Sequence, residues 1–478
     1  MKDFREFVLE YADADTARLL LSCREWPEPP VRELAERTGA RNLAANTLEA
    51  RRKLRRKVPQ WYARPELVYP DVLCAEQCSS AETARYKADL ATGIASGPSS
   101  GTPGHSPAMS ASPGVRGLPG APAATAGGPR IADLTGGLGV DSWAFSRIAE
   151  QVLYNEMDPA LAAAAKYNFA CLGCGGILVS NRELAPGNLA GILGSFVPDV
   201  IFLDPSRRAP DGRKVFLPED CRPDVLTLLP ELFSVCRHLL LKLSPMADIT
   251  LLVKRLGEAA QGACLPGNPV REIHVVATGG ECRELLLWLD RECTEACSVI
   301  CCESGSTLTF KSSEEREASA RLLTEAEFAR MTEAQSFRTA KARPEDPRET
   351  FRYLFEPGRS LTKGGLFNAL GDRFGLVKLG LHTHLYLAEA SSERLERFGN
   401  IFRINEIHPL DKRTVKAIGK RFPNADVTAR NIPMTSEELA KRLKVAPGSG
   451  VHLFGVRIDF TSTAAVNYLL VCSRTDEF

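Results

Sequence analysis

The sequence predicts an α/β protein built around a doubly wound, mostly parallel sheet. Between residues 130 and 312, short apolar stretches alternate with helix-prone ones, which is the rhythm of βαβ units. A glycine-rich turn follows the first apolar stretch, and acidic residues follow two later ones. Six stretches fit buried strands, at residues 131–134, 152–155, 176–179, 200–203, 239–243 and 273–277.

Size and composition indicate a globular protein of several domains. The chain has 478 residues, enough for about two to four domains. Hydrophobic residues make up 44% and charged residues 25%, an ordinary globular balance. No apolar run approaches the ~20 residues that span a bilayer, and the charged first ten residues lack the apolar stretch of a signal peptide. We therefore expect a cytoplasmic protein with no membrane partner.

The helix-prone region before the sheet carries a strongly basic run. Residues 51–57 hold six cations in seven positions, and Trp61 follows soon after. Such a run could hold phosphates while the indole stacks on a base. The alternative is a solvated helix face, which we favour.

Residues 95–129 differ in composition from the rest of the chain. They consist largely of Gly, Pro, Ser, Ala and Thr, with Arg116 as the one Lys or Arg and no acid. Such a segment cannot bury enough apolar surface to offset its chain entropy, so we expect a flexible insertion. Among the 14 cysteines, Cys171 and Cys174 form one C-x-x-C without a second pair, so no metal site is expected.

The C-terminal part predicts a charged helical arm and then a small sheet with helices on one side. Residues 351–478 carry 19 Lys and Arg against 13 Asp and Glu, a net +6, whereas the rest carries 41 against 46, a net −5. A basic module beside an acidic body fits a polyanion partner, and a solvated basic surface fits equally well. The expected strands are 401–407, 426–430, 451–457 and 467–473, and the helices are 412–421 and 436–443.

The glycine-rich turn is the strongest local signal for a bound cofactor. Residues 133–141 read DLTGGLGVD, an apolar strand end, a turn and the start of a helix. Glycines let the backbone approach a ligand, and a helix N-terminus offers unpaired N–H groups. The spacing differs from the G-x-G-x-x-G fingerprint. The candidate cofactor-binding residues here are Asp133, Thr135, Gly137 and Gly139.

Acidic residues follow the second and third strands. Glu156 stands where Rossmann-type folds hold a ribose diol, and Asp158 is its local rival, better suited to an N-cap. Glu183 follows the third strand, where an acid can face an adenine amino group. We therefore add Glu156 and Glu183 to the candidate cofactor site.

The fourth and fifth strands end in further polar residues. Residues 204–208 read DPSRR, so Asp204, Arg207 and Arg208 meet at the edge of the sheet. Asp204 can accept a hydrogen bond from a base amino or imino proton, whereas the plain alternative is a tight turn with a solvated arginine pair. The next edge, residues 242–248, reads KLSPMAD and lacks a cysteine, which argues against covalent catalysis.

Together these motifs resemble a bacterial family of class I S-adenosylmethionine-dependent methyltransferases with a C-terminal THUMP-like domain. The DPSRR run is similar to the D-P-P-[YFWR] motif of enzymes that methylate nucleobases, although Ser206 replaces the second proline. The resemblance covers nearly the whole chain outside the insertion. It rests on residues 77–80, 83–87, 133–141, 204–208, 242–248, 280–285, 353–357, 384–386 and 428–433.

The resemblance implies a Rossmann-like methyltransferase sheet, an N-terminal helical region and small C-terminal α+β modules. The expected domains are 1–92 (helical), 93–129 (insertion), 130–312 (methyltransferase), 313–350 (arm), 351–398 (ferredoxin-like) and 399–478 (THUMP-like). It also implies S-adenosylmethionine as cofactor and, because THUMP domains bind RNA, an RNA substrate.

The implied reaction is direct in-line methyl transfer to a base. The catalytic candidates are Asp204 and Arg207, Asp204 also lies beside the cofactor, and the substrate-binding candidates are Arg208, Lys242, Ser244 and Asp248. Two alternatives remain open: an RNA-binding protein on a degenerate methyltransferase scaffold, and a methyltransferase acting on DNA, protein or a small molecule.

Overall fold

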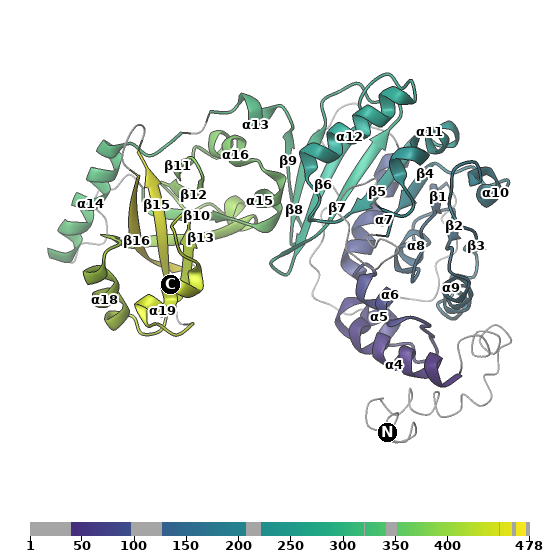
Figure 1. The fold of residues 1–478 in the computed structure, drawn as a ribbon, viewed down its shortest axis with the longest axis horizontal. Coiled ribbons are helices and arrows are strands. Elements are labelled where there is room, and N and C mark those ends of the chain that lie inside the picture. Colours follow the sequence, from purple (N-terminus) through teal and green to yellow (C-terminus); the bar gives the residue numbers. More distant parts are fainter. Residues whose placement is uncertain are drawn as a thin grey trace. The chain divides into compact units, whose positions relative to one another are not determined.

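The computed structural model describes residues 40–96, 127–206, 221–319, 321–340, 351–448, 450–460 and 465–474 (Figure 1). The chain divides into two compact units, Met1–Val276 with Arg283–Cys297, and Ala277–Cys282 with Ser298–Phe478. Within the described ranges, no helix is both long enough and apolar enough to cross a membrane.

The first unit contains the expected doubly wound sheet. Its strands run in the order β3-β2-β1-β4-β5-β7-β6, with β1 to β5 parallel and β7 antiparallel to β5. All six predicted strands are confirmed, with ends shifted by up to three residues, whereas β7 was missed. The strands are β1 Arg130–Asp133, β2 Gln151–Asn155, β3 Leu178–Ser180, β4 Val200–Leu203, β5 His238–Leu243, β6 Val270–Thr278 and β7 Glu281–Asp290.

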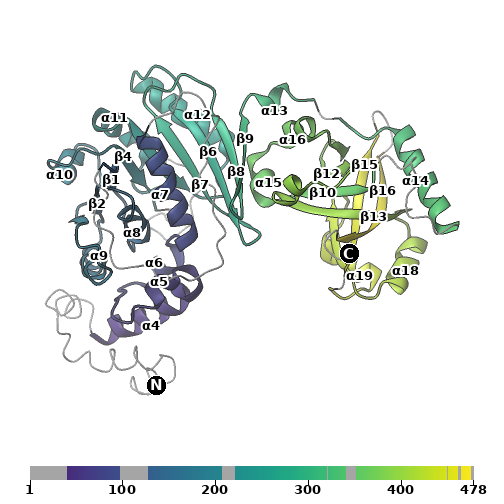
Figure 2. The same ribbon diagram turned by 180° about the vertical axis from the view of Figure 1, so that it is seen from behind.

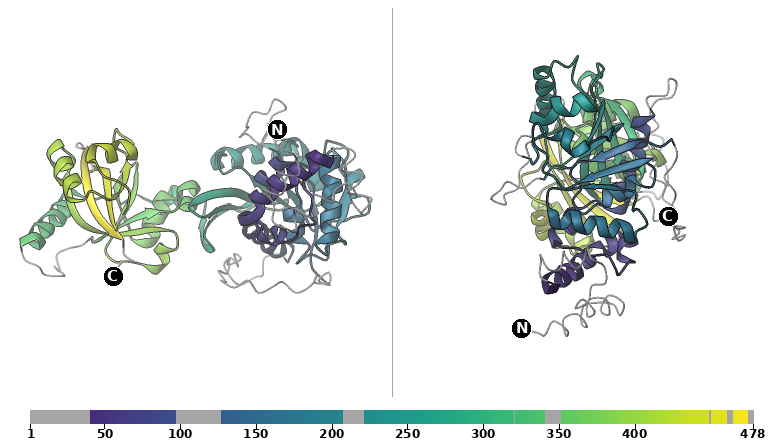
Figure 3. Two further views of the ribbon diagram at one scale, coloured as in Figure 1. Left: turned by 90° about the horizontal axis from the view of Figure 1, so that it is seen from below. Right: turned by 90° about the vertical axis from the view of Figure 1, so that its right-hand side faces the viewer.

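Helices pack on this sheet in two groups (Figures 2 and 3). Helix α7 packs on α8 and against β4 and β5, whereas α11 packs on α12 and against β5. Local signals define where these helices begin: Asp158 caps α9, as predicted, and Asp224 caps α11. The helices are α7 Ala81–Ala95, α8 Val140–Phe145, α9 Pro159–Cys171, α10 Leu189–Leu193, α11 Val225–Val235 and α12 Ile249–Gly262.

The helical region that precedes α7 is joined to the sheet domain by side-chain to backbone hydrogen bonds. The amide of Asn168 in α9 both donates to the Val68 carbonyl, at 2.8 Å, and accepts from the Val68 N–H, at 3.0 Å. The helices of this region are α4 Ala40–Lys57, α5 Pro59–Tyr62 and α6 Val72–Gln77. Residues 1–39, and most of the expected insertion (97–126), lie outside the described residues.

The basic run of residues 51–57 lies on α4, and part of it faces the interior. Arg51 is buried and donates to the carbonyls of Arg64 and Tyr62, at 2.9 Å each. Trp61 is buried as well, so its indole is not free to stack on a base. Arg55 and Arg56 are exposed, as the solvated-face interpretation expects. Arg51 is therefore excluded as a phosphate ligand and Trp61 as a stacking platform for a base, because both side chains are buried in the core.

The second unit contains a seven-stranded sheet in the order β11-β12-β10-β13-β16-β15-β14. Every strand and helix predicted for residues 399–478 is confirmed. The strands are β10 Tyr353–Pro357, β11 Val377–Gly380, β12 Thr383–Ala388, β13 Gly399–Pro409, β14 Asp426–Arg430, β15 Val451–Asp459 and β16 Ala465–Arg474. The unit also includes the hairpin β8 Ser298–Glu303 and β9 Ser306–Lys311, and helices α13 Glu314–Glu317, α14 Glu325–Ala340, α15 Arg359–Gly364, α16 Phe367–Phe374, α17 Glu393–Glu396, α18 Lys412–Arg421 and α19 Ser436–Leu443.

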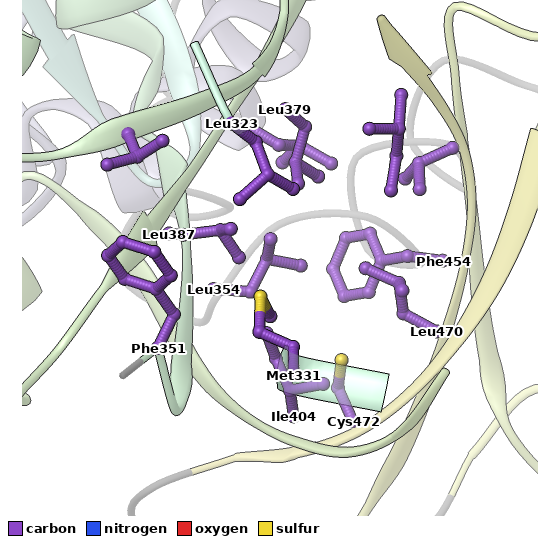
Figure 4. Close-up of a cluster of buried hydrophobic side chains, with 14 of the residues drawn as sticks. Leu323, Met331, Phe351, Leu354, Leu379, Leu387, Ile404, Phe454, Leu470 and Cys472 are labelled. Atoms are coloured by element: carbon purple, nitrogen blue, oxygen red, sulfur yellow. The ribbon is translucent and has the colours of Figure 1, made fainter. Parts of the chain in front are cut away.

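One hydrophobic cluster joins distant parts of the second unit (Figure 4). Leu354 of β10 and Leu387 of β12 pack with Phe454 of β15 in the same buried cluster. Met331 of α14 and Leu323 just before it also belong to this cluster. The segment expected to be a connecting arm thus supplies part of the core of this unit. Helices α18 and α19 pack in a separate cluster with Leu453, Leu469 and Val471 on the other side of the sheet.

The first prediction concerns the buried arginine of α4. Arg51→Met should lower the free energy of unfolding by about 3 kcal/mol, because two carbonyls lose charged donors. Arg55→Met, in the same basic run but exposed, is the matched control and should change it by no more than about 0.5 kcal/mol. Urea unfolding of both variants checks this. Equal effects would mean that Arg51 is not needed in the core.

Candidate active site

The glycine-rich turn between β1 and α8 is open on its outer side. Gly137 and Gly139 have φ angles of +52° and +91°, a left-handed region that favours glycine. A Cβ on Gly139 would lie 2.7 Å from the Phe169 ring, so only glycine fits there. A Cβ on Gly137 would meet no atom closer than 4.0 Å. The space beside the Gly137 Cα is therefore open, while its N–H donates to Glu156 and its carbonyl accepts from the Tyr154 hydroxyl.

Asp133 supports this turn from beneath. Its carboxylate accepts hydrogen bonds from the Ser142 hydroxyl at 2.6 Å and from the Thr135 N–H at 3.3 Å. The side chain is buried, and burial raises the pKa of Asp133 to about 8, with the Asp141 carboxylate adding to the shift. In this structure Asp133 shapes the turn and is 1% exposed.

Glu156 lies beside the open part of the turn. Its carboxylate accepts from the N–H of Gly137 at 2.8 Å and from the N–H of Asp158 at 2.9 Å. Burial raises the pKa of Glu156, and these two hydrogen bonds oppose the shift. The acid predicted at the end of β2 is thus brought to the turn predicted after β1.

The third strand end is organised by an amide that sequence reasoning missed. Asn155, the last residue of β2, donates to the carbonyls of Leu134 and Arg182 and accepts from the Arg182 N–H. Three strand ends are thereby linked. A buried polar residue at the end of an apolar strand was the signal available. Glu183 is exposed on the loop after β3.

Asp204 joins the turn after β1 to the fifth strand. Its N–H donates to the Thr135 hydroxyl at 2.6 Å, so this threonine of the turn has a structural role. Its carboxylate forms an ion pair with Lys242 of β5. The Asp204 side chain is 27% exposed and that of Lys242 is 4% exposed, so the carboxylate is the accessible member of the pair and the ammonium is the buried one.

The electrostatic surroundings keep Lys242 charged. Burial alone would lower the pKa of Lys242, but the nearby carboxylates, with Asp204 first, raise it above its ordinary value. Ser244 is buried, and its hydroxyl accepts from the N–H of Met246 at 3.1 Å. Asp248 is exposed and caps α12 by accepting from the Leu251 N–H at 2.9 Å. Its carboxylate therefore has a structural partner.

Two predicted residues lie outside the described part of the chain. Arg207 and Arg208 belong to residues 207–220, which the structure does not describe. Two described residues near the ends of this gap pair with each other: Ser206 and Arg222 exchange backbone hydrogen bonds of 2.7 and 3.0 Å. Ser206, two residues after Asp204, therefore lies side by side with Arg222.

Residues of α7 and the loop before it complete the inner side of the site. Lys87 is buried and donates to Glu284 of β7 at 2.8 Å and to the Ser79 hydroxyl at 2.9 Å. It also pairs with Asp141 at 3.2 Å. The family motifs around these residues were recognised in the sequence, but their convergence was not. Ser80 caps α7 by accepting a hydrogen bond from the N–H of Thr83. The Thr83 side chain is buried.

The C-terminal part of the chain is similar to two known domain families. Residues 353–395 match a ferredoxin-like domain family, and residues 399–474 match a THUMP-like domain family. No curated protein matches the chain.

Among solved structures, the chain resembles a candidate methyltransferase from Porphyromonas gingivalis W83 along its whole length. The identity is 27%, the TM-score is 0.69, and the match covers 99% of this chain and 98% of that one. Two further matches extend over about a third of the chain. A ribosomal protein L11 methylase from Lactobacillus delbrueckii subsp. bulgaricus matches at 19% identity, TM-score 0.24, covering 35% of this chain and 71% of that one. A SAM-dependent methyltransferase from Agrobacterium tumefaciens matches at 20% identity, TM-score 0.24, covering 34% and 56%.

The raised pKa of Asp133 predicts how stability depends on pH. The folded state holds this proton more tightly than the unfolded chain, so its contribution to stability falls as pH rises from about 4 to about 8. Asp133→Asn cannot ionise and should lose less stability across that range than the wild type. Urea unfolding at pH 5 and pH 8.5 measures the difference. Equal pH dependence in the two proteins would contradict a buried, protonatable Asp133.

Proposed function

We propose that this protein is a cytoplasmic S-adenosylmethionine-dependent methyltransferase that methylates a base in RNA. The observation that carries the proposal is the meeting of Gly137, Glu156 and Asp204 at one edge of the sheet. Ligands of open α/β sheets bind at the carboxyl ends of the strands. There an open space beside a glycine, a carboxylate for a ribose and a carboxylate for an acceptor lie on adjoining strand ends.

The residues of the turn fit the cofactor. Glu156 would accept hydrogen bonds from the ribose hydroxyls, and Gly137 with Gly139 would let the backbone approach the ligand. Asp133 and Thr135 hold the turn in that shape. Glu183, exposed beyond β3, would face the adenine amino group. When bound, S-adenosylmethionine supplies an electrophilic methyl group on a sulfonium.

Asp204 is the proposed catalytic carboxylate. It would accept a hydrogen bond from an amino or imino proton of the base and so orient the acceptor for in-line transfer. Lys242 pairs with this carboxylate, and Ser244 and Asp248 lie beyond it along the same edge. Arg207 and Arg208 are proposed to meet the base and a phosphate of the substrate.

The second unit supports RNA as the substrate. Helix α18 carries five basic residues and no acid, and all five are exposed. Arg421 also pairs with Glu406 at 2.8 Å, so the other cations, Lys412, Arg413, Lys416 and Lys420, are the stronger candidates for phosphate contacts. Mapping modified nucleosides by mass spectrometry, in total RNA from cells with and without this gene, would name the product. An unchanged set of methylated nucleosides would count against an RNA substrate.

The cofactor prediction is specific to two residues. S-adenosylmethionine should bind with micromolar affinity, about −8 kcal/mol. Glu156→Ala should weaken binding by about tenfold or more, because charged hydrogen bonds to the ribose are lost. Gly137→Val should also weaken it, by placing a side chain in the open space. Glu258→Ala, on the exposed part of α12, should leave it unchanged. Calorimetry on folded variants decides, and unchanged affinity in both site variants would mean that the cofactor site is elsewhere.

Binding of RNA and methyl transfer should be separable. Replacing the five basic residues of α18 with serine should weaken RNA binding and flatten its salt dependence, because fewer counterions are released. Cofactor affinity should not change. Asp204→Ala should leave both ligands bound while transfer of labelled methyl groups to RNA falls by roughly 10²-fold or more. Gel shifts across a salt series and transfer assays measure the two effects.

The control for α18 is the removal of exposed cations from another helix. Replacing Lys254 and Arg255 of α12 with serine removes two exposed cations from the first unit. The salt slope should then stay as in the wild type. If the α18 variant also keeps the wild-type slope, that helix is only a solvated face. The exposed Arg55 and Arg56 of α4 would be the next residues to replace.

A further inference from the structure

Opposite charges alternate through the interior behind the candidate active site. Asp204 pairs with Lys242, and Lys87 pairs with both Glu284 and Asp141. These two ion-paired groups lie on one face of the sheet, because Lys242 lies opposite Leu286 in the β5–β7 pairing. Glu284 is two residues from Leu286 and therefore on the same face as Lys242. After Asp204, the carboxylates of Glu284 and Asp141 also raise the pKa of Lys242.

Asp204 is the most exposed of these charged side chains. The exposed fractions are 0% for Lys87, 3% for Glu284, 4% for Lys242 and 10% for Asp141, against 27% for Asp204. Asp204 is thus the accessible end of three carboxylates and two ammonium groups. Asp141 stands in the first turn of α8, directly after the glycine-rich turn. The Lys87 group therefore begins at the candidate cofactor turn, and the Lys242 pair on the same face of the sheet ends at the candidate catalytic carboxylate.

The buried ammonium of Lys87 has several partners. The Lys87 ammonium contacts both oxygens of Glu284, at 2.8 and 3.1 Å, together with Ser79. The Ser79 hydroxyl donates to Asp141 at 2.8 Å. Charges removed from water are tolerated only with good geometry, and removing one partner leaves its counterpart uncompensated. The arrangement permits few alternative positions for Lys87, and the Glu284 carboxylate that it holds lies on the face of the sheet that carries Lys242.

We propose that Lys87, contributed by the N-terminal helix α7, is a positioning residue for methyl transfer. Through Glu284 and Asp141 it sets the place of the Lys242 ammonium, and Lys242 in turn orients the Asp204 carboxylate toward the acceptor. The N-terminal helical region is then part of the catalytic apparatus, although Lys87 itself touches no substrate. This inference rests on the proposed function of Asp204.

The test compares Lys87→Met with the double variant Lys87→Met, Glu284→Gln in the full-length chain. In the single variant, kcat for methyl transfer to RNA should fall by about tenfold or more, because a displaced reacting group lowers the rate steeply. KM for RNA and Kd for S-adenosylmethionine should stay within about threefold, because the contacts to both ligands remain. The double variant should regain part of the lost thermal stability, since no unpaired buried carboxylate remains at position 284, but it should not regain kcat.

Hydrogen exchange followed by mass spectrometry gives a readout that needs no activity. The N–H of Asp204 donates to Thr135, so displacement of Asp204 should speed exchange in residues 203–206, while the α9 peptide stays protected. Lys254→Met, at an exposed position of α12, is the matched control and should change neither kcat nor exchange.

Three outcomes would overturn the positioning role. One is faster exchange throughout the first unit, with kcat and cofactor binding lost together, which would make Lys87 only a stabiliser of the fold. Another is a double variant that regains both stability and kcat. The third is unchanged exchange at residues 203–206. If the wild type methylates no RNA, the proposed function fails, and the exchange measurement still decides whether Lys87 positions Asp204.

Discussion

The candidate site depends on the attachment of the fourth strand end to the first. The N–H of Asp204 bonds to the Thr135 hydroxyl, and the Asp204 carboxylate is held by Lys242. Transfer between two bound molecules requires that donor and acceptor stay at a fixed separation. The turn that would hold the donor and the carboxylate that would face the acceptor are here linked by one short side chain. Thr135 therefore has a task that a glycine at this position could not perform.

The N-terminal helices are integral to this arrangement. Asn168 forms two hydrogen bonds with Val68, and Arg64 donates to the Cys171 carbonyl at 2.5 Å, so the helical region is held along α9. Helix α7 continues from that region across the sheet and brings Lys87 to Glu284. A buried ammonium needs counter-charges, and these come from β7 and α8. The ion pairs of Lys87 therefore join the N-terminal helices to the sheet domain.

In the second unit, apolar contacts join segments that are distant in the sequence. The ferredoxin-like match ends at residue 395 and the THUMP-like match begins at 399, yet β10 pairs with β13 and their side chains share one cluster. The two matched segments therefore fold around a common core, with Met331 and Leu323 of the preceding segment included. The basic helix α18 packs on the other side of the sheet, which leaves its cations in solvent.

The sequence by itself determined the features that arise between near neighbours along the chain. The parallel strands, the cap at Asp158 and the turn around Gly137 follow from apolar runs, short-range hydrogen bonds and the backbone freedom of glycine. The carboxyl ends of parallel strands lie at one edge of a sheet. An acid after β2 is therefore expected beside the turn that follows β1, and Glu156 lies there. Only the tertiary structure decided the burial of Arg51 and the pairing of Lys87 with Glu284, which are 197 residues apart. The stability of a buried charge depends on which faces meet in space, and residue spacing does not specify that.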